Sequence, residues 1–225
     1  FQTSTNTITL NNGCAIAGDK RLSYGKIVGA YFGMPGGELI GRGTIRPGAG
    51  ANILTIDLED WPAAVLDPRH DITERVVENT RRCLHILQWN KVRATFFVLG
   101  RVAERFPALI REVHAAGHEL ASHGYGHELL TRLTPAQFEA DVRRSIDILV
   151  GIIGERPLGY RAPGFSIVES TRWAGPILAD LGFTYSSSIF PIRHPRYGIP
   201  DEPRHIHRWK GCRLIECPPA TVRML

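Results

Sequence analysis

Ser122-His123-Gly124-Tyr125-Gly126-His127 follows directly on Glu119-Leu120-Ala121, a short segment that we predict to be a β-strand. A strand that ends at one histidine, with a second histidine four residues later, can direct two imidazoles at a single metal ion. Taken alone, such a pair lies on a protein surface about as often as it binds a metal. The metal hypothesis therefore depends on which residues the other predicted strands carry at their ends.

From residue 52 onward, strand-like and helix-like segments alternate along the chain. Short apolar runs predict further strands over residues 52–56, 94–99, 158–160 and 183–186. Apolar residues at helical spacing predict helices over residues 72–89, 101–116, 134–149 and 169–181. This alternation predicts an α/β fold with a largely parallel sheet, either open or closed into a barrel.

Local signals mark the ends of several of these helices. Asp71 followed by Glu74 resembles a capping box at the start of the first helix. Thr134-Pro135-Ala136-Gln137 shows the same pattern with proline in the first turn. Gly117 stands where a glycine is expected after a helix, and Pro176 predicts a bend or interruption in the last helix.

Polar side chains stand at the carboxyl ends of three predicted strands. The first strand is followed by Asp57, Glu59 and Asp60, the third by His123 and His127, and the fourth by Arg161. In parallel α/β folds these ends meet at one edge of the sheet, where chemistry collects. One carboxylate and two histidines form a common ligand set for a catalytic divalent ion, which lowers the pKa of bound water from about 15.7 towards about 7. A second carboxylate can accept the proton of that water, and a neighbouring arginine would keep this carboxylate charged.

Each of these groups also has a plainer explanation. Asp57-Leu58-Glu59-Asp60 could be a solvated turn before the next helix, and Arg161 could pair with a surface carboxylate. The two histidines could be surface residues. All of them would then have to fall on strand ends by coincidence, so the metal site is the better hypothesis.

The composition is that of an ordinary globular protein. The 225 residues suffice for one substantial domain or two small ones, and 43% of them are hydrophobic. The net charge is +5, but Lys and Arg are scattered, which argues against nucleic acid as a partner. No apolar run reaches the roughly 18 residues of a membrane span, and residues 1–30 lack a signal-peptide pattern. We therefore expect a cytoplasmic location, with association with the cell envelope as the alternative.

Four segments carry a resemblance to a known family. In order, they read Leu54-Thr55-Ile56-Asp57, Ala94-Thr95-Phe96-Phe97, Ser122-His123-Gly124-Tyr125-Gly126-His127 and Tyr160-Arg161-Ala162-Pro163. They resemble successive motifs of the polysaccharide deacetylases, the NodB-homology enzymes of carbohydrate esterase family four, and the similarity covers about residues 52–219. Two later segments resemble the subgroup found in bacterial exopolysaccharide loci, often beside exosortase systems: Ser187-Ser188-Ile189-Phe190-Pro191 and Arg196-Tyr197-Gly198-Ile199-Pro200.

The resemblance implies a distorted (β/α) barrel that holds a divalent metal, usually zinc. The implied reaction is hydrolytic removal of acetyl groups from the N-acetylated amino sugars of a polysaccharide. Asp57 matches the general base, and Arg161 matches the arginine that positions it. His123 and His127 match the two metal-binding histidines.

Tyr125 and Pro163 lie within the matching motifs, and we expect both to contact the substrate. A backbone donor near Tyr125 is expected to stabilise the oxyanion together with the metal. Two other functions stay open: a metal-dependent amidohydrolase of small cyclic amides, and a non-catalytic carbohydrate-binding or assembly protein.

The chain departs from the family pattern at the third metal ligand. Many members have two adjacent aspartates, the second of which binds the metal, but position 58 is leucine here. The carboxylate ligand is therefore Glu59 or Asp60. Aspartate is the commoner ligand type and favours Asp60, whereas Glu59 keeps an Asp-x-acid spacing that some relatives show.

The family's late histidine, which protonates the leaving amine, has no match in this chain. His194, His205 and His207 lie in a Pro- and Arg-rich segment that comes too early for that motif. We therefore expect the chain to be C-terminally incomplete, with a polysaccharide deacetylase domain at residues 51–225. Residues 1–50 are expected to be a leader that forms no domain of its own.

Overall fold

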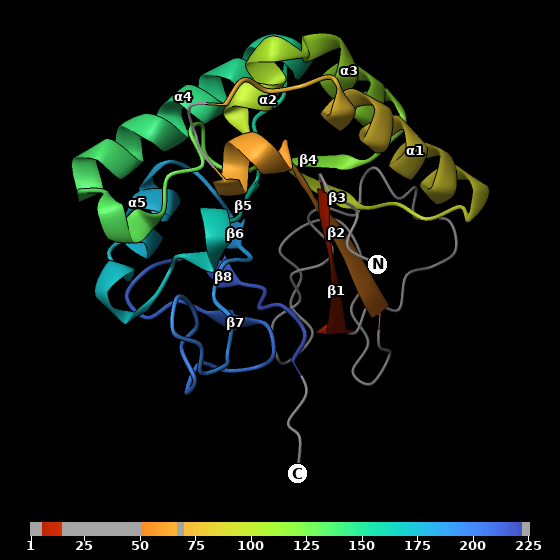
Figure 1. The fold of residues 1–225 in the computed structure, drawn as a ribbon. Coiled ribbons are helices and arrows are strands. Elements are labelled where there is room, and N and C mark those ends of the chain that lie inside the picture. The colour runs from red at the N-terminus through yellow and green to blue at the C-terminus, as the bar shows by residue number, and fades with distance from the viewer. Residues whose placement is uncertain (1–5, 15–50, 67–69, 222–225) are drawn as a thin grey trace.

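A single sheet organises the fold. The structure, a computed structural model, describes residues 6–14, 51–66 and 70–221 (Figure 1). These residues form an eight-stranded sheet with the spatial order β1-β2-β3-β4-β5-β6-β8-β7. The strands are β1 (Asn6–Cys14), β2 (Ala51–Leu58), β3 (Thr95–Val98), β4 (Glu119–Ser122), β5 (Gly159–Tyr160), β6 (Tyr185–Ser186), β7 (His207–Arg208) and β8 (Ile215–Glu216).

Most of the sheet is parallel, as the sequence predicts. Strands β2 to β6 and β8 run parallel, whereas the edge strands β1 and β7 pair antiparallel with their neighbours. Parallel neighbours need crossover connections, which helices supply from β2 to β6, whereas the chain passes from β6 to β8 through β7. The helices are α1 (Arg75–Trp89), α2 (Gly100–Arg105), α3 (Pro107–Ala115), α4 (Pro135–Ile153) and α5 (Ala174–Asp180). Figure 1 shows α1 to α4 arched over one side of the sheet, which is the α/β arrangement of a distorted (β/α) barrel.

The side chains on the two faces of β2 belong to two different hydrophobic clusters. Ile56 and Leu58 belong to the larger hydrophobic cluster, which residues of α1, α2 and α3 complete. Ile53 belongs to a second cluster with Phe97 of β3, on the inner side of the sheet. Because side chains alternate along a strand, Asp57 shares the inner side with Ile53 rather than the helix-covered side with Leu58.

Strand β1 lies within the segment that was expected to be a leader. It pairs antiparallel with β2 along its whole length. The sequence analysis predicts no strand there, and the only local signal is the short alternation Thr7-Ile8-Thr9-Leu10. The remainder of residues 1–50 lies outside the described residues.

The prediction of one helix over residues 101–116 is wrong, because this segment forms the two helices α2 and α3. Pro107 begins α3 and has no N–H to continue α2. A proline also disfavours the helical region for the preceding residue, and Phe106 adopts φ −127° and ψ 59°. Gly117 after α3 is left-handed, with φ +79°, as expected of a glycine that ends a helix.

The start of α1 also differs from the prediction. The helix begins at Arg75, and its N-cap residue Glu74 makes no side-chain capping bond. The N–H of Thr73 donates instead to the carboxylate of Asp60, at the end of β2. This long-range bond ties the segment before α1 to the end of β2, so the expected Asp71–Glu74 capping box is absent.

The last two predicted helices have contrasting outcomes. The capping box of Thr134 and Gln137 is confirmed at the start of α4. The helix predicted over residues 169–181 is a short 3-10 turn, Glu169–Thr171, followed by α5. Pro176 lies in the first turn of α5, where its missing N–H has no helical partner to lose. None of the helices in the described part of the chain combines the length and the apolarity that a bilayer crossing requires.

Candidate metal centre

Of the three carboxylates at the end of β2, Asp57 and Glu59 reach the inner side of the sheet, whereas Asp60 lies at the segment before α1. Asp57 and Glu59 are two residues apart and therefore reach the same inner side, as alternation along an extended chain requires. Asp60 instead accepts a hydrogen bond of 2.5 Å from the N–H of Thr73. Residue type favours Asp60 as a ligand, but the structure brings Glu59 to the histidines and Asp60 to the segment before α1. Alternation along the strand explains this difference.

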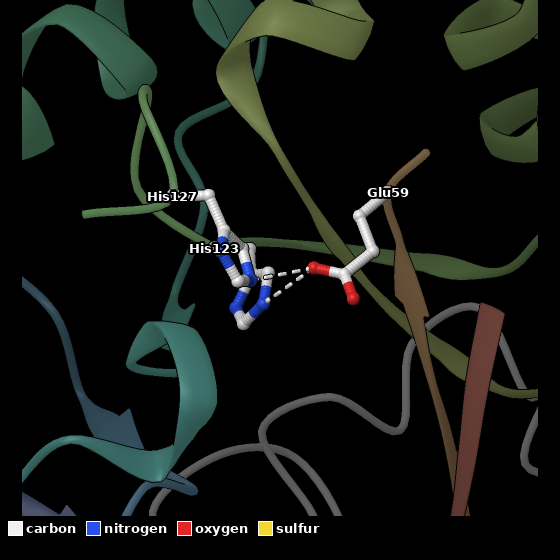
Figure 2. Close-up of side chains that lie close together, drawn as sticks. All are labelled: Glu59, His123 and His127. Atoms are coloured by element: carbon white, nitrogen blue, oxygen red, sulfur yellow. Dashed lines mark ion pairs between the residues drawn. The ribbon is translucent and has the colours of Figure 1, made fainter. Parts of the chain in front are cut away.

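Glu59, His123 and His127 bring three possible ligand atoms together. Figure 2 shows both imidazoles facing the Glu59 carboxylate, with Glu59 Oε2 2.8 Å from His127 Nε2 and 3.3 Å from His123 Nε2. One ligand atom of each residue lies within 4.8 Å of the other two. The ligands of a tetrahedral zinc, with bonds of about 2.0–2.2 Å, lie about 3.3 Å apart. The cluster therefore has the dimensions of a metal site.

The hydrogen bond of His123 shows why this cluster fits a cation. His123 Nδ1 lies 2.8 Å from the main-chain oxygen of Arg161, and a carbonyl oxygen can only accept. The proton of neutral His123 is therefore on Nδ1, and the Nε2 lone pair faces the Glu59 carboxylate. Glu59 Oε2 is buried and makes no hydrogen bond of acceptable geometry among the described residues. Two buried acceptors that face each other need a cation between them, which a metal ion provides.

The charges around the cluster also favour a cation. Burial by itself raises the pKa of the Glu59 carboxyl, but the two neighbouring imidazoles outweigh burial and lower that pKa. Burial likewise opposes protonation of His123, yet the negative charges of Asp57 and Glu59 raise its pKa. The Glu59 carboxylate is thus favoured in its ionised form and attracts positive charge to the neighbouring imidazole nitrogens.

The loop that carries His127 is held by Asp141 of α4. The Asp141 carboxylate accepts hydrogen bonds from the N–H groups of Tyr125, at 2.8 Å, and Gly126, at 3.0 Å. His127 itself has φ +63°, a left-handed conformation that is uncommon for residues other than glycine. A Cβ atom at Gly124 would lie 2.8 Å from Asp141, so the approach of the loop to α4 requires glycine there. Asp141 therefore stabilises a strained loop that presents His127 to the cluster.

The N–H of Tyr125 donates to Asp141, so the expected backbone donor to the oxyanion would be another N–H near Tyr125, and that expectation stays a prediction. The Tyr125 hydroxyl donates to Glu104 at 2.9 Å, and the guanidinium carbon of Arg144 lies 3.6 Å from the centroid of the Tyr125 ring. These contacts make Tyr125 part of a network between α2 and α4. Pro163, the other expected substrate contact, is buried at the start of a short turn after β5.

Asp57 and Arg161 form a buried ion pair beside the cluster. Arg161 Nη1 donates to Asp57 Oδ1 at 2.7 Å and to Thr55 Oγ1 at 3.0 Å. Arg161 Nε and Nη2 donate to the main-chain and hydroxyl oxygens of Ser187. The guanidinium carbon also lies 4.1 Å from the centroid of the Phe97 ring. Arg161 is therefore held from several sides and orients Asp57 towards the interior.

A second buried carboxylate, Glu216 of β8, fixes the segment that holds Arg161. It accepts hydrogen bonds from the N–H groups of Ser188 and Ile189, at 2.7 and 2.8 Å, and from Trp209 Nε1. The sequence analysis identified neither Glu216 nor Ser187 as a residue of the site. Ser187 begins the segment Ser187–Pro191, but no local pattern shows that either residue supports Arg161, because their partners are distant in the chain.

The three late histidines do not join the cluster. His194 stacks on Tyr197, with ring centroids 3.8 Å apart, and His207 Nε2 lies 2.8 Å from Glu202. His205 lies beside His207, at the edge strand β7. Within the described ranges, only Glu59 and the two motif histidines form a group that could hold a metal ion.

Comparisons with known proteins bear on the family to which the chain belongs. Residues 59–186 match the family model described as polysaccharide deacetylase. The peptidoglycan-N-acetylglucosamine deacetylase of Bacillus cereus is 31% identical over 99 residues, which cover 44% of this chain and 36% of that protein. Chitin deacetylase 1 of Cryptococcus neoformans is 30% identical over 99 residues, which cover 44% of this chain and 20% of that protein. The solved structure of a candidate polysaccharide deacetylase from Mycobacterium smegmatis has a TM-score of 0.52 and 34% identity, and the match covers 63% of this chain and 45% of that one.

The fold is that of an α/β deacetylase domain. The chain belongs to the polysaccharide deacetylase family, because more than half of its residues match the family model. The matched span includes Glu59, His123, His127 and Arg161 and begins just after Asp57. The chain spans about a third of the length of the Bacillus cereus relative and a fifth of the Cryptococcus neoformans relative.

Proposed function

We propose that this chain carries the metal-binding and base residues of an N-deacetylase that acts on the amino sugars of a polysaccharide. The observation that carries the proposal is the cluster of Glu59, His123 and His127 beside the buried Asp57–Arg161 pair. A divalent ion, when bound by these three residues, supplies Lewis acidity and lowers the pKa of water to about 7. We propose zinc, because two imidazoles and one carboxylate suit that ion.

Asp57 acts as the general base in this proposal. Arg161 engages Asp57 Oδ1, and we assign to Oδ2 the proton of the water that attacks the acetamide carbonyl. Arg161 holds the Asp57 carboxylate in place through Oδ1, so that Oδ2 is the oxygen left to accept this proton. His123 contributes by keeping its proton on Nδ1, where the Arg161 carbonyl holds it, so that Nε2 stays available as a ligand.

The substrate class follows from the family and its relatives. The names of the Bacillus cereus and Cryptococcus neoformans proteins refer to peptidoglycan and chitin, which are polymers of N-acetylated amino sugars. We extend this class to the present chain. Ser187–Pro191 and Arg196–Pro200 resemble the exopolysaccharide-locus subgroup, so we propose an exopolysaccharide as the polymer.

Acetate release tests the proposal. The full-length protein is stripped with a chelator, reloaded with zinc and incubated with N-acetylated amino-sugar polymers. We expect the wild type to release acetate and Asp57→Asn to bind zinc normally while releasing little acetate. Asp147→Asn, on the exposed side of α4, is the matched control and should behave as wild type.

The alternatives give different outcomes. Acetate release from no polymer, together with hydrolysis of a small cyclic amide, would replace the deacetylase with a small-amide hydrolase. Zinc binding without hydrolysis of either substrate would contradict an enzymatic role and favour a carbohydrate-binding protein. Failure of the wild type to bind any divalent metal would overturn the assignment of the cluster itself.

A further inference from the structure

Four aromatic rings form a continuous row beside the proposed catalytic pair. The centroids of Phe165 and Phe190 are 4.6 Å apart, and those of Phe190 and Tyr197 are 5.6 Å apart. His194 extends the row by stacking on Tyr197, with centroids 3.8 Å apart and an interplanar angle of 21°. Phe165 comes from the turn after β5, and the other three rings come from the connection between β6 and β7. We call Phe165, Phe190, Tyr197 and His194 the aromatic row.

The row begins at Arg161. The guanidinium carbon of Arg161 lies 5.4 Å from the centroid of Phe165 and 4.1 Å from that of Phe97 in the inner core. Arg161 is fully buried and pairs with Asp57. The Phe165 ring therefore contacts the residue that orients the base. The centroids of Phe165 and Tyr197 are 6.3 Å apart, so Phe165, Phe190 and Tyr197 form a compact group that His194 extends.

The exposure of the rings distinguishes the row from a loop core. All four members are partly exposed, whereas four smaller apolar residues of the same segments are buried: Pro163, Ile189, Pro191 and Ile199. A loop that needed only a core of its own would bury its largest apolar rings first. Here the aliphatic residues form that core, and the aromatic rings lie over it at the surface.

Backbone geometry fixes the first ring of the row. Phe165 has φ +52°, directly after Gly164 with φ +57°, and a left-handed conformation is a true outlier for a bulky residue. The N–H of Phe165 donates to the carbonyl of Ala162 at 3.0 Å, which closes this turn. Such strain persists where the surrounding structure enforces it, and it clusters at functional sites.

Hydrogen bonds fix the far end of the row. The carbonyl of Phe190 accepts the N–H groups of both Ile192 and Ile199, which closes the loop. His194 Nδ1 accepts the N–H of Arg196 at 3.2 Å, so the proton of the neutral His194 ring is on Nε2. The row is therefore organised before any ligand binds, and it carries a hydrogen-bond donor at its outer end.

We propose that the aromatic row is a binding subsite for a sugar ring of the polymer, next to the acetamido sugar that reacts at the metal centre. The inference rests on the proposed function and extends it. The C–H groups on one face of a pyranose carry partial positive charge and pack on the negative face of an aromatic ring. The hydroxyl groups at the sugar's edge need polar partners, which His194 Nε2 can supply. The row thereby selects polymers over single sugars.

Kinetics against substrate length test the subsite. We compare Tyr197→Ala and Tyr197→Phe on an N-acetylated amino-sugar monosaccharide and on oligosaccharides of increasing length. Tyr197→Ala should raise KM about tenfold for the longer oligosaccharides, should leave kcat unchanged, and should not alter the monosaccharide reaction. Tyr197→Phe keeps the ring and should behave as wild type. Trp89→Ala removes an exposed aromatic ring on α1, remote in the sequence, and is the matched control.

Two outcomes overturn the subsite. One is an unchanged KM of Tyr197→Ala for every substrate length, and the other is an equal loss on the monosaccharide. Thermal unfolding checks that each variant is folded. If Tyr197→Ala fails this check, His194→Ala answers the same question, because it removes the outer ring and leaves the other three in place.

Ligand binding separates this inference from the proposed function. Saturation-transfer NMR measures oligosaccharide binding to Asp57→Asn, with and without Tyr197→Ala, and requires no turnover. Binding that depends on Tyr197, together with a wild type that releases no acetate from any polymer, would sustain the subsite and reject the deacetylase. Acetate release by the wild type, together with oligosaccharide binding that does not depend on Tyr197, would sustain the deacetylase and reject the subsite.

Discussion

Arg161 Nη1 lies 2.7 Å from Asp57 Oδ1, with the two side chains 0% and 6% exposed. The same guanidinium donates to Thr55 and to two oxygens of Ser187. A lysine has neither the planar fork nor the number of donors needed to replace these bonds. We expect Arg161→Lys to lower the rate of acetate release at least about 100-fold, because Asp57 loses its fixed orientation.

The free energy of unfolding tests the ion pair between Arg161 and Asp57 independently of the reaction rate. Arg161→Met leaves Asp57 as a buried charge without its partner, which should lower the free energy of unfolding by about 3–5 kcal/mol. Arg143 pairs with Glu139 on the surface of α4, where both side chains are largely exposed. Arg143→Lys should change the free energy of unfolding by less than about 0.5 kcal/mol. Urea unfolding measures both, and equal effects of the two substitutions would contradict the buried pair.

Glu59 and Asp60 should differ in their effect on metal affinity. Glu59→Gln removes the charge that faces the two histidines, so we expect it to weaken zinc binding at least about 100-fold. Asp60→Asn removes only the charge that the N–H of Thr73 contacts, so zinc affinity should stay within about threefold of wild type. Competition with a chelating dye measures both affinities. The opposite ranking would restore Asp60 as the ligand.

Much of the site was predictable because its residues stand at strand ends. Asp57, His123 and Arg161 each follow a short apolar run, and parallel strands bring such ends together. The choice between Glu59 and Asp60 was also within reach, because alternation along β2 places residues 57 and 59 on the same side. Residue type favours Asp60, whereas the geometry of the strand brings Glu59 to the histidines.

The supporting residues were not predictable, because only the tertiary fold gives them partners. Asp141 is one polar residue among several on α4, and nothing local marks it as the acceptor of two loop N–H groups. Glu216 lies in a two-residue strand, too short for any period to show. The break at Pro107 had a local signal, since proline at a helix start is common, but an apolar period that continued across it concealed the break.

Asp141 should control the metal site without touching the metal. Asp141→Ala leaves the N–H groups of Tyr125 and Gly126 without their acceptor, so we expect a loss of about 1–3 kcal/mol in the free energy of unfolding. The left-handed conformation of His127 also loses its support, so zinc affinity should fall about tenfold or more. Asp147→Ala, also on α4 but exposed, should change neither quantity. Wild-type zinc affinity in a folded Asp141→Ala protein would show that the loop holds His127 unaided.

Two glycines should respond to alanine in opposite directions. A Cβ at Gly159 would lie 2.0 Å from Cζ of the buried Tyr185 ring, so Gly159→Ala should destabilise the protein by about 1–3 kcal/mol through overpacking. Gly151 lies within α4 with no neighbouring atom inside 4 Å of the new Cβ. Gly151→Ala should therefore stabilise the protein by about 0.5–1 kcal/mol. Equal and small effects in urea unfolding would mean that Tyr185 can move aside.

Glu119 should make stability depend on pH. Burial raises the pKa of its carboxyl from 4.5 to about 7, even though the hydroxyls of Thr95 and Tyr185 donate to it. Between these two values the folded protein keeps a proton that the unfolded chain releases. The free energy of unfolding therefore falls as pH rises through this window, by about 3 kcal/mol from Glu119 alone. Glu119→Gln is neutral throughout and should lack this contribution.

The neighbouring His118 makes the comparison with Glu119→Gln necessary. Burial, helped by the charge of Arg93, lowers the pKa of His118 from 6.5 to about 4, so His118 contributes stability that is lost as pH falls through that range. Its slope opposes that of Glu119, and the wild-type curve alone would show little. The difference in free energy of unfolding between wild type and Glu119→Gln cancels His118 and should decline steadily from about pH 4.5 to about pH 7. A difference that stays flat across that window would show that Glu119 ionises in the folded protein as freely as in the unfolded chain.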